Sequence, residues 1–280
     1  MAMDETVSAA LRTAAATLAA TSDTARLDAE LLMAHALGVT RSELLLHHMA
    51  QPAPTEFAPL LARRQNQEPV AYILGTQPFF GLDFLVSPDV LIPRSDSEVL
   101  IEAALKARPD AARVLDCGTG SGALLLAVLA QLPEAQGVGI DRSLAALAVA
   151  AANAARLGLG TRAQLLHADW EDTGWSRDLG PFDLILANPP YVEDNAQLAA
   201  SVRGHEPAGA LFAGPEGLDA YRRLLPQLPC LLAPRGVALT EIGAGQAKAV
   251  SAIARAAGLA VTLHRDLAER PRVLELVHNA

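Results

Sequence analysis

The chain has 280 residues, of which 51% are hydrophobic and 19% are charged, and this length allows one or two domains with a sizeable core. Its formal net charge of −9 at pH 7 argues against non-specific nucleic-acid binding, which depends on Lys and Arg neutralising phosphates, and leaves room only for a local basic patch. The chain has two cysteines, no run of roughly 18 apolar residues and no cationic start before an apolar core, so we expect a cytoplasmic protein without disulfides, signal peptide or membrane span.

Residues 1–75 predict a small helical bundle. Apolar residues recur at helical spacing over 7–18 and again over 27–37, where Asp23 is the candidate N-cap, and a further helix is expected over 55–67. Short amphipathic helices with short joints are typical of a bundle. It fits a folding accessory and a substrate-docking module equally well.

Two short patterns lie inside this bundle. Thr40 and Glu43 form a capping box at the start of another helix. His47 and His48 are adjacent, so they point to different faces of a helix and make a poor metal pair. No other Cys or His spacing resembles a metal site, and we expect none.

Residues 76–92 predict a β-hairpin linker after the bundle. Its aromatic run includes Phe79, Phe80 and Phe84, which are more often core residues than ligand contacts, although one of them could close over a ligand. Arg94 follows in a Leu-Ile-Pro-Arg turn. It either anchors the hinge by an ion pair, which we favour, or meets a carboxylate of a ligand.

From Ser95 onward, strand and helix patterns alternate, which predicts a mainly parallel sheet with helices on both faces. Ser95 and Glu98 give the first helix a capping box. One helix over 217–232 is expected to bridge the fourth and fifth strands. The expected strands span residues 112–116, 136–141, 163–168, 182–187, 236–242, 259–265 and 272–277.

The first of these strands runs into a glycine-rich turn that fits a nucleoside site. The sequence Cys117-Gly118-Thr119-Gly120-Ser121-Gly122 leads into a helix, and its alternating glycines let the backbone pass close to a ligand. The next strand ends in Asp141, a position from which a carboxylate accepts from ribose hydroxyls in dinucleotide sites. Taken alone, this pattern also fits a nicotinamide dehydrogenase.

A second motif has no place in a dehydrogenase. The strand over 182–187 ends in Asn188-Pro189-Pro190-Tyr191. The prolines fix φ and carry no N–H, so the Asn188 side chain and the Pro189 carbonyl can both offer acceptors to the two N–H bonds of a planar amide or exocyclic amine. Tyr191 could cover that plane with its ring. Ligands in such sheets bind beyond the carboxyl ends of the strands, so we expect both motifs at one rim.

These motifs resemble a known family. Asp116-Cys117-Gly118-Thr119-Gly120-Ser121-Gly122 is similar to motif I of S-adenosylmethionine-dependent methyltransferases, and Asn-Pro-Pro-Tyr to the signature of their amino-methylating members. With the Leu-Ile-Pro-Arg turn, Ala168-Asp169-Trp170 and the tail over 265–273, the whole chain resembles the bacterial release-factor glutamine N5-methyltransferases, the HemK family. That family usually has Pro-Asp-Thr-Glu after Leu-Ile-Pro-Arg, where this chain has Ser-Asp-Ser-Glu over 95–98.

The resemblance implies an α/β fold. A Rossmann-like class I methyltransferase domain over 93–280 would carry a seven-stranded mixed sheet of order 3-2-1-4-5-7-6, with the last strand antiparallel. It would follow the bundle and the hairpin linker. The implied substrate is the glutamine of the Gly-Gly-Gln loop of peptide-chain release factors, with no direct nucleic-acid or membrane partner.

The resemblance also implies a set of site residues. The implied catalytic residues are Asn188, Pro189, Pro190 and Tyr191. The implied cofactor is S-adenosylmethionine, bound by Gly118, Thr119, Gly120, Ser121, Gly122, Asp141, Asp169, Trp170 and Asn188. Asp116 would either orient the glycine turn or meet the cofactor ammonium. Glu241 ends the fifth strand near this rim and is unassigned, because a capped strand end explains it equally well.

Two other classes of function remain. Asn-Pro-Pro-Tyr would serve the amino group of a nucleic-acid base equally well, but the acidic charge and the absence of a target-recognition insertion oppose this reading. A dehydrogenase-type or non-catalytic nucleoside binder fits the glycine turn and leaves Asn-Pro-Pro-Tyr without a task.

Overall fold

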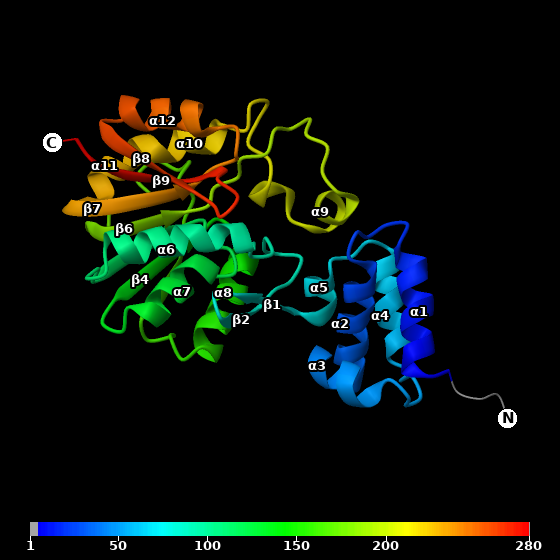
Figure 1. Ribbon diagram of the computed structural model, residues 1–280. Coiled ribbons are helices and arrows are strands. Elements are labelled where there is room, and N and C mark those ends of the chain that lie inside the picture. Colours follow the sequence, from blue (N-terminus) through cyan, green and yellow to red (C-terminus); the bar gives the residue numbers. More distant parts are fainter. Residues whose placement is uncertain (1–4, 280) are drawn as a thin grey trace. The chain divides into compact units, whose positions relative to one another are not determined.

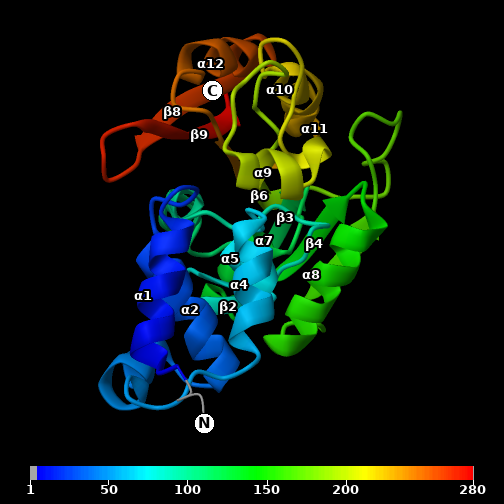
Figure 2. The same ribbon diagram turned by 90° about the vertical axis from the view of Figure 1, so that its right-hand side faces the viewer.

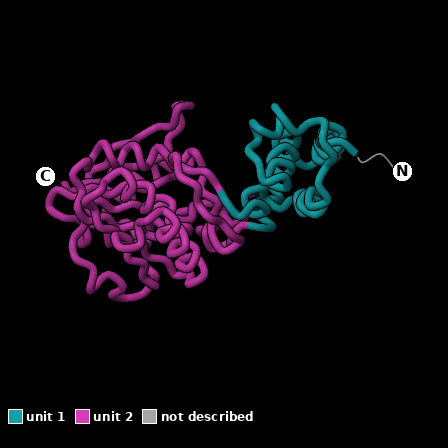
Figure 3. Tube along the Cα trace, turned by 90° about the horizontal axis from the view of Figure 1, so that it is seen from below, with its two compact units in different colours: residues 1–76, 198–205 teal, residues 77–197, 206–280 magenta. Residues whose placement is uncertain are grey.

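The computed structural model describes residues 5–279 and divides into two compact units (Figure 3). Unit 1 contains the residues up to Thr76 together with Leu198–His205, and unit 2 contains Gln77–Gln197 and the residues from Glu206 onward. The second piece of unit 1 has no counterpart in the boundaries expected from the sequence.

Unit 1 is a helical bundle in which three helices pack against one another (Figures 1 and 2): α1 (Val7–Leu18), α2 (Ala25–Leu37) and α4 (Phe57–Gln65). Its core consists of apolar side chains from these helices, among them Leu11, Leu18, Leu32 and Met33, which are fully buried. The shorter elements are α3 (Arg41–Glu43), the π-helical turn η1 (Leu44–His48), α5 (Val70–Leu74) and α9 (Ala200–His205). The helical spacing in the sequence therefore reflects a real packed core.

The helix ends of unit 1 follow the sequence in one case and depart from it in another. The capping box of Thr40 and Glu43 is confirmed, since each side chain accepts from the backbone N–H of the other residue. The expected N-cap at Asp23 is wrong. Thr24 precedes α2, and its hydroxyl donates to Asp28 at 2.8 Å instead of capping the helix. Asp28 is buried and pairs with Arg64 of α4, also at 2.8 Å, so the start of α2 is fixed by a buried carboxylate.

Unit 2 is built on a seven-stranded sheet in the order β5-β4-β3-β6-β7-β9-β8. When the strands of this sheet are numbered by themselves, the order is 3-2-1-4-5-7-6, and the last strand is antiparallel to its neighbours, so the expected topology is confirmed. The strands are β3 (Arg113–Cys117), β4 (Gln136–Asp141), β5 (Ala163–His167), β6 (Phe182–Ala187), β7 (Leu232–Glu241), β8 (Leu259–Arg265) and β9 (Pro271–His278). A separate hairpin, β1 (Thr76–Phe79) and β2 (Leu82–Leu85), precedes it.

Helices cover both faces of the sheet (Figure 1). Alternate residues of one strand point to opposite faces: Val114 packs beneath the first layer of helices, and Leu115 beneath the second. The first layer consists of α6 (Glu98–Ala107), α7 (Ala123–Gln131) and α8 (Leu144–Arg156). The second consists of α10 (Asp219–Leu224), η4 (Leu225–Gln227), α11 (Leu228–Leu231) and α12 (Ala247–Ala256).

Two local expectations for unit 2 are wrong. The single helix over 217–232 is broken into three short elements, because Pro226 and Pro229 each remove a backbone donor. The capping box of Ser95 and Glu98 does not form. Residues Ser95–Ser97 make a 3-10 turn, η2, and the Glu98 carboxylate accepts from the backbone N–H of Phe80 at 2.8 Å. The Glu98 carboxylate is therefore bonded to the hairpin turn and does not cap the helix.

Candidate active site

A cavity of about 410 Å³ lies at the carboxyl ends of β3, β4 and β6 in unit 2. Because these strands are parallel, the loops that follow them meet at one rim, as expected. The predicted site residues that line the cavity are Gly118, Thr119, Gly120, Ser121, Asp141, Asp169, Trp170, Asn188 and Pro190. The remaining three, Gly122, Pro189 and Tyr191, are not among the lining residues.

The glycine turn is held against the end of β4. The backbone N–H groups of Gly118 and Thr119 both donate to the carbonyl of Ile140, at 2.9 and 2.8 Å. Gly118 and Gly120 have positive φ values of 76° and 55°, a conformation that favours glycine. Gly122 also has a positive φ, of 81°, and is the N-cap of α7, where an added Cβ would meet Leu126 and Ala150.

Asp141 is fixed by two backbone donors. Its Oδ2 accepts from the N–H of Gly120 and its Oδ1 from the N–H of Ser143, both at 2.9 Å. Each carboxylate oxygen keeps a further lone pair, and the residue lines the cavity. The carboxylate therefore holds the glycine turn in place and can also accept from a ligand hydroxyl.

Asp116 lies beneath the glycine turn and is fully buried. The hydroxyl of Thr119 donates to its Oδ2 at 2.7 Å, whereas Oδ1 has no hydrogen-bond partner among residues 5–279. Burial raises the pKa of this carboxyl to about 7, and the nearby charge of Asp141 acts in the same direction. A buried acceptor without a partner is costly, and the ammonium group of S-adenosylmethionine is a fitting partner. In this respect the site suits that cofactor.

The loop after β5 supplies one wall of the cavity. Trp170 and Asp169 both line it, and an added Cβ on Gly118 would be 3.0 Å from the Trp170 ring. Gln227 supports this loop by donating to the Trp170 carbonyl at 3.0 Å and accepting from the indole N–H of Trp175 at 2.6 Å. A flat aromatic wall with a carboxylate beside it suits a purine ring and its amino group.

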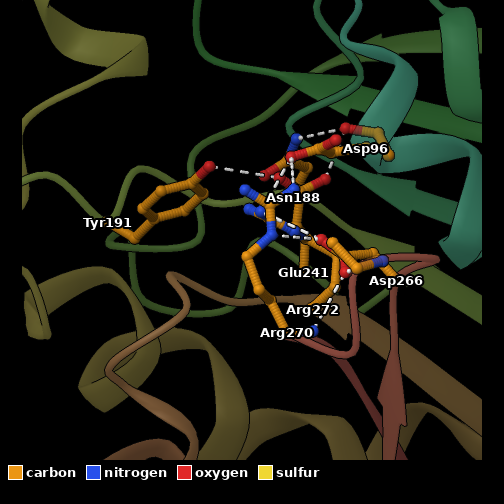
Figure 4. A network of polar contacts seen from close by, with 9 residues as sticks. Asp96, Asn188, Tyr191, Glu241, Asp266, Arg270 and Arg272 are labelled. Carbon is orange, nitrogen blue, oxygen red and sulfur yellow. Dashed lines mark hydrogen bonds and ion pairs between the residues drawn. The ribbon is translucent and has the colours of Figure 1, made fainter.

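The Asn-Pro-Pro-Tyr segment directly follows β6. Figure 4 shows the side chains of Asn188 and Tyr191. Asn188 lines the cavity, and its Nδ2 lies 3.5 Å from Oγ of Ser97. Pro189 is buried, while Pro190 lines the cavity. Tyr191 donates from its hydroxyl to Glu241 at 3.1 Å, and burial raises its pKa.

The structure shows the contacts of Arg94 and of Phe79, for which the sequence left two roles open. Arg94 forms an ion pair with the buried carboxylate of Glu206, which is the structural role favoured above, and it also lines the cavity. Among the three phenylalanines, Phe79 lines the cavity while being only 2% exposed, and its ring packs edge-on against Phe84. It is a core residue that also borders the ligand space.

Among the lining residues that sequence reasoning missed are Ser97, Arg142 and Phe212. Arg142 directly follows Asp141, so its place at the rim could have been read from the strand end. Phe212 reaches the rim because Val192 pairs with it in a parallel bridge. That pairing joins two irregular segments, and no pattern in the sequence marks it.

Two further observations concern metal sites and membrane-spanning helices. Among the described residues, no group of three or more His, Cys, Asp or Glu side chains could hold a metal ion. Over the same range, none of the helices combines the length and the apolar character that crossing a bilayer requires.

Comparison with known proteins identifies the family of this chain. A family model described as the PrmC N-terminal domain matches residues 9–75, and one described as a methyltransferase domain matches residues 109–219. The release factor glutamine methyltransferase of Caulobacter vibrioides is 44% identical, with 92% of this chain and 91% of the relative covered. That of Cereibacter sphaeroides is 45% identical, with 95% and 96% covered. That of Geobacter sulfurreducens is 46% identical, with 81% and 80% covered. The chain belongs to the family of release factor glutamine methyltransferases.

Proposed function

We propose that this chain transfers the methyl group of S-adenosylmethionine to the side-chain amide nitrogen, N5, of the glutamine in the Gly-Gly-Gln motif of peptide-chain release factors. Asn188 carries the proposal. This residue places an amide group at the wall of a cavity whose other residues suit the cofactor. The relatives of the chain are named for glutamine methylation.

The nucleophile explains why the site needs acceptors. A carboxamide nitrogen shares its lone pair with its carbonyl, so it attacks weakly. When bound, S-adenosylmethionine supplies an electrophilic methyl group. Asn188 and the Pro189 carbonyl would accept from the two N–H bonds of the glutamine and hold its nitrogen in line, and such positioning contributes ~7 to 11 kcal/mol when the geometry is close to attack. The nitrogen becomes acidic as it is methylated, so its proton can leave late, without a dedicated base.

Other residues that line the cavity would hold the cofactor. Gly118 and Gly120 bring the backbone close to its methionine end, Asp141 accepts from its ribose hydroxyls, and Trp170 with Asp169 flanks its adenine. All five residues line the same cavity, which supports this assignment. Oδ1 of Asp116, which has no partner among residues 5–279, would accept from its ammonium group, although Asp116 is not itself a lining residue.

Unit 1 is proposed as the docking module for the release factor. The substrate glutamine sits on a loop of a folded protein, and specific protein interfaces usually bury at least ~1,200 Å² in total, more than a glutamine pocket offers. Unit 1 is a separate compact body, and Leu45 and Leu46 of η1 expose 36% and 74% of their surface. Exposed apolar side chains of this kind suit a protein partner.

The proposal also places the enzyme in the cytoplasm, where translation is terminated. Cys117 and Cys230 are both free thiols, as expected in a reducing compartment.

One assay tests the function. Tritiated S-adenosylmethionine is incubated with the enzyme and with release factor, DNA or RNA in parallel, and the labelled product is mapped by mass spectrometry. We expect label only in release factor, on the glutamine of the motif, and none in a release factor whose motif glutamine is replaced by alanine. Label in DNA or RNA instead would favour the base-methylating alternative.

A further inference from the structure

Glu241 is a buried carboxylate beside the proposed site that the function above leaves without a task. It ends β7, is 2% exposed, and accepts from two hydroxyl groups, Ser97 at Oε2 and Tyr191 at Oε1. Figure 4 shows it next to Asn188 and Tyr191. Burying a carboxylate is costly, so its presence at a strand end calls for a reason.

Capping of the strand does not supply that reason. The backbone carbonyl of Glu241 accepts from the Tyr221 hydroxyl at 2.9 Å, and the N–H of the next residue, Ile242, donates to the carbonyl of Arg272 at 2.8 Å. The backbone at the end of β7 is therefore satisfied without the carboxylate. The side chain of Glu241 is left free for its two hydroxyl partners.

The direction of these hydrogen bonds determines how Asn188 is oriented. Ser97 has a single hydroxyl proton, and it donates this proton to Oε2 of Glu241. Ser97 Oγ then offers only lone pairs to Asn188, and the Asn188 group at 3.5 Å from it is the NH2. The opposite orientation would set the Asn188 oxygen against those lone pairs. Asn188 consequently keeps Oδ1 as the free acceptor of its amide.

The groups around this network act on the Glu241 carboxyl in both directions. Ser97 sits in the η2 turn, which is held by an ion pair between Asp96 and Arg272 at 2.7 Å (Figure 4). Arg272 is only 8% exposed, and its Nη2 also lies 3.7 Å from Asp266. Burial raises the pKa of the Glu241 carboxyl and the charge of Asp96 acts in the same direction, while the hydroxyls of Ser97 and Tyr191 and the charge of Arg272 lower it; the pKa is raised on balance.

We propose that Glu241 is a positioning residue for glutamine methylation, which fixes the Asn188 amide through Ser97 with its oxygen toward the substrate and anchors Tyr191 through its hydroxyl. This rests on the proposed function, because only a substrate with N–H donors makes the amide orientation matter. With the amide reversed, Asn188 would present NH2 to the NH2 of glutamine. Glu241 thus fixes the side chains of both Asn188 and Tyr191, the first and last residues of the Asn-Pro-Pro-Tyr segment.

Activity of full-length variants tests the proposal. Glu241→Gln and Ser97→Ala should each lower kcat for release factor about 10- to 100-fold, because the acceptor is misplaced. The affinity for S-adenosylmethionine, measured by calorimetry, should stay within about twofold. Ser97→Thr keeps the hydroxyl and should restore most of kcat. The double variant Ser97→Ala/Glu241→Gln should lose little more than Glu241→Gln, since both changes break one chain of contacts.

Tyr221→Phe is the matched control, because it removes a hydrogen bond to the Glu241 backbone and leaves the carboxylate bonds intact. We expect it to lower the melting temperature and to leave kcat within about twofold. The proposal is overturned if Glu241→Gln keeps wild-type kcat, if Ser97→Thr and Ser97→Ala lose equal activity, or if Tyr221→Phe loses as much as Glu241→Gln.

A spectroscopic readout separates this inference from the proposed function. The chain has five asparagines, so selective 15N labelling resolves the side-chain NH2 of Asn188, which is assigned by its disappearance in Asn188→Ala. One of its two proton signals should shift in Ser97→Ala and in Glu241→Gln and stay in place in Ser97→Thr. If the wild-type enzyme methylates no release factor, the proposed function fails, and these shifts alone decide whether Glu241 orients Asn188. Unchanged signals in both variants would refute the positioning role.

Discussion

The ring of Trp170 lies directly over Gly118. A Cβ on residue 118 would be 3.0 Å from Cη2 and 3.1 Å from Cζ3 of that ring, a tight contact that would require the ring to shift slightly. The φ angle of Gly118 is +76°, which adds backbone strain to any larger residue. The glycine turn and the proposed adenine wall are therefore fitted to each other.

Gly118→Ala should weaken cofactor binding through this contact. We expect the dissociation constant of S-adenosylmethionine to rise at least about tenfold, since strain of ~1 to 2 kcal/mol is added to displacement of the ring. Gly120→Ala is the control, because Gly120 also has positive φ but has open space within 4 Å of an added Cβ. Calorimetry that gave equal losses for both variants would show that Trp170 is not the limiting contact.

Asn188→Ala removes an acceptor from the proposed substrate pocket. By analogy with loss of one preorganised hydrogen bond, turnover should fall ~10²- to 10³-fold. Cofactor affinity should change much less, because the other residues of the cavity remain. Single-turnover methylation of release factor is the measurement, and near-normal methyl transfer would remove Asn188 from the mechanism.

Asp141→Ala should act on cofactor binding. A charged acceptor for a hydroxyl is worth roughly 1.5 to 3 kcal/mol, so the dissociation constant of S-adenosylmethionine should rise by about one to two decades. Asp141→Asn keeps an oxygen for one of the two backbone donors, Gly120 or Ser143. Its affinity for S-adenosylmethionine should therefore lie between those of the wild type and Asp141→Ala. Unchanged affinity, or tighter binding of NAD than of S-adenosylmethionine, would contradict the assignment.

Leu46→Glu tests docking through unit 1. If this exposed leucine is buried against the release factor, the KM for intact release factor should rise about tenfold or more, because burying a leucine is worth ~1.5 to 3 kcal/mol. A short Gly-Gly-Gln peptide should be methylated as by the wild type. Leu144→Glu is the control, since Leu144 is similarly exposed, at 67%, but lies on α8 of unit 2. Equal losses on protein and peptide would exclude a docking role for Leu46.

Asp116 predicts a pH dependence of stability in the cofactor-free enzyme. Its pKa is raised by burial from 3.8 to about 7, so between these values the folded state binds more protons than the unfolded state. Stability contributed by this group is therefore lost as pH rises from about 4 to 7. Glu241, whose pKa burial also raises, acts in the same sense. Urea unfolding at pH ~5 and ~8 should show a smaller loss in Asp116→Asn than in the wild type, and equal losses would contradict the buried, raised carboxyl.

Most of the fold follows from local patterns in the sequence. Buried strands such as 182–187 and the glycine turn are short-range signals, and the order of the sheet follows from the family resemblance. The failures occur where a distant group competes for a side chain. The Ser95 and Glu98 pattern is a valid capping box, but Phe80, at the tip of the hairpin, donates to Glu98 instead.

The same reason limits what the sequence says about the site. The lining residues that adjoin strand ends, such as Asp141 and Asn188, were predictable from those ends. Ser97 and Glu241 are 144 positions apart, and their contact exists only because the η2 turn meets the end of β7. Tyr191 was expected as a wall of the pocket, and its hydroxyl turns to Glu241 because that carboxylate needs a donor.

The path of the chain through the two units has a consequence for exchanging parts between relatives. Leu198–His205 leaves unit 2 after the Asn-Pro-Pro-Tyr segment, joins unit 1, where His205 meets the carbonyl of Asn66 at 3.2 Å, and returns. The bundle is thus not formed by one continuous amino-terminal segment of the chain. A chimaera that takes the bundle from another species must import α9 with it, and a graft of the amino-terminal segment alone should fold poorly even when both parents are stable.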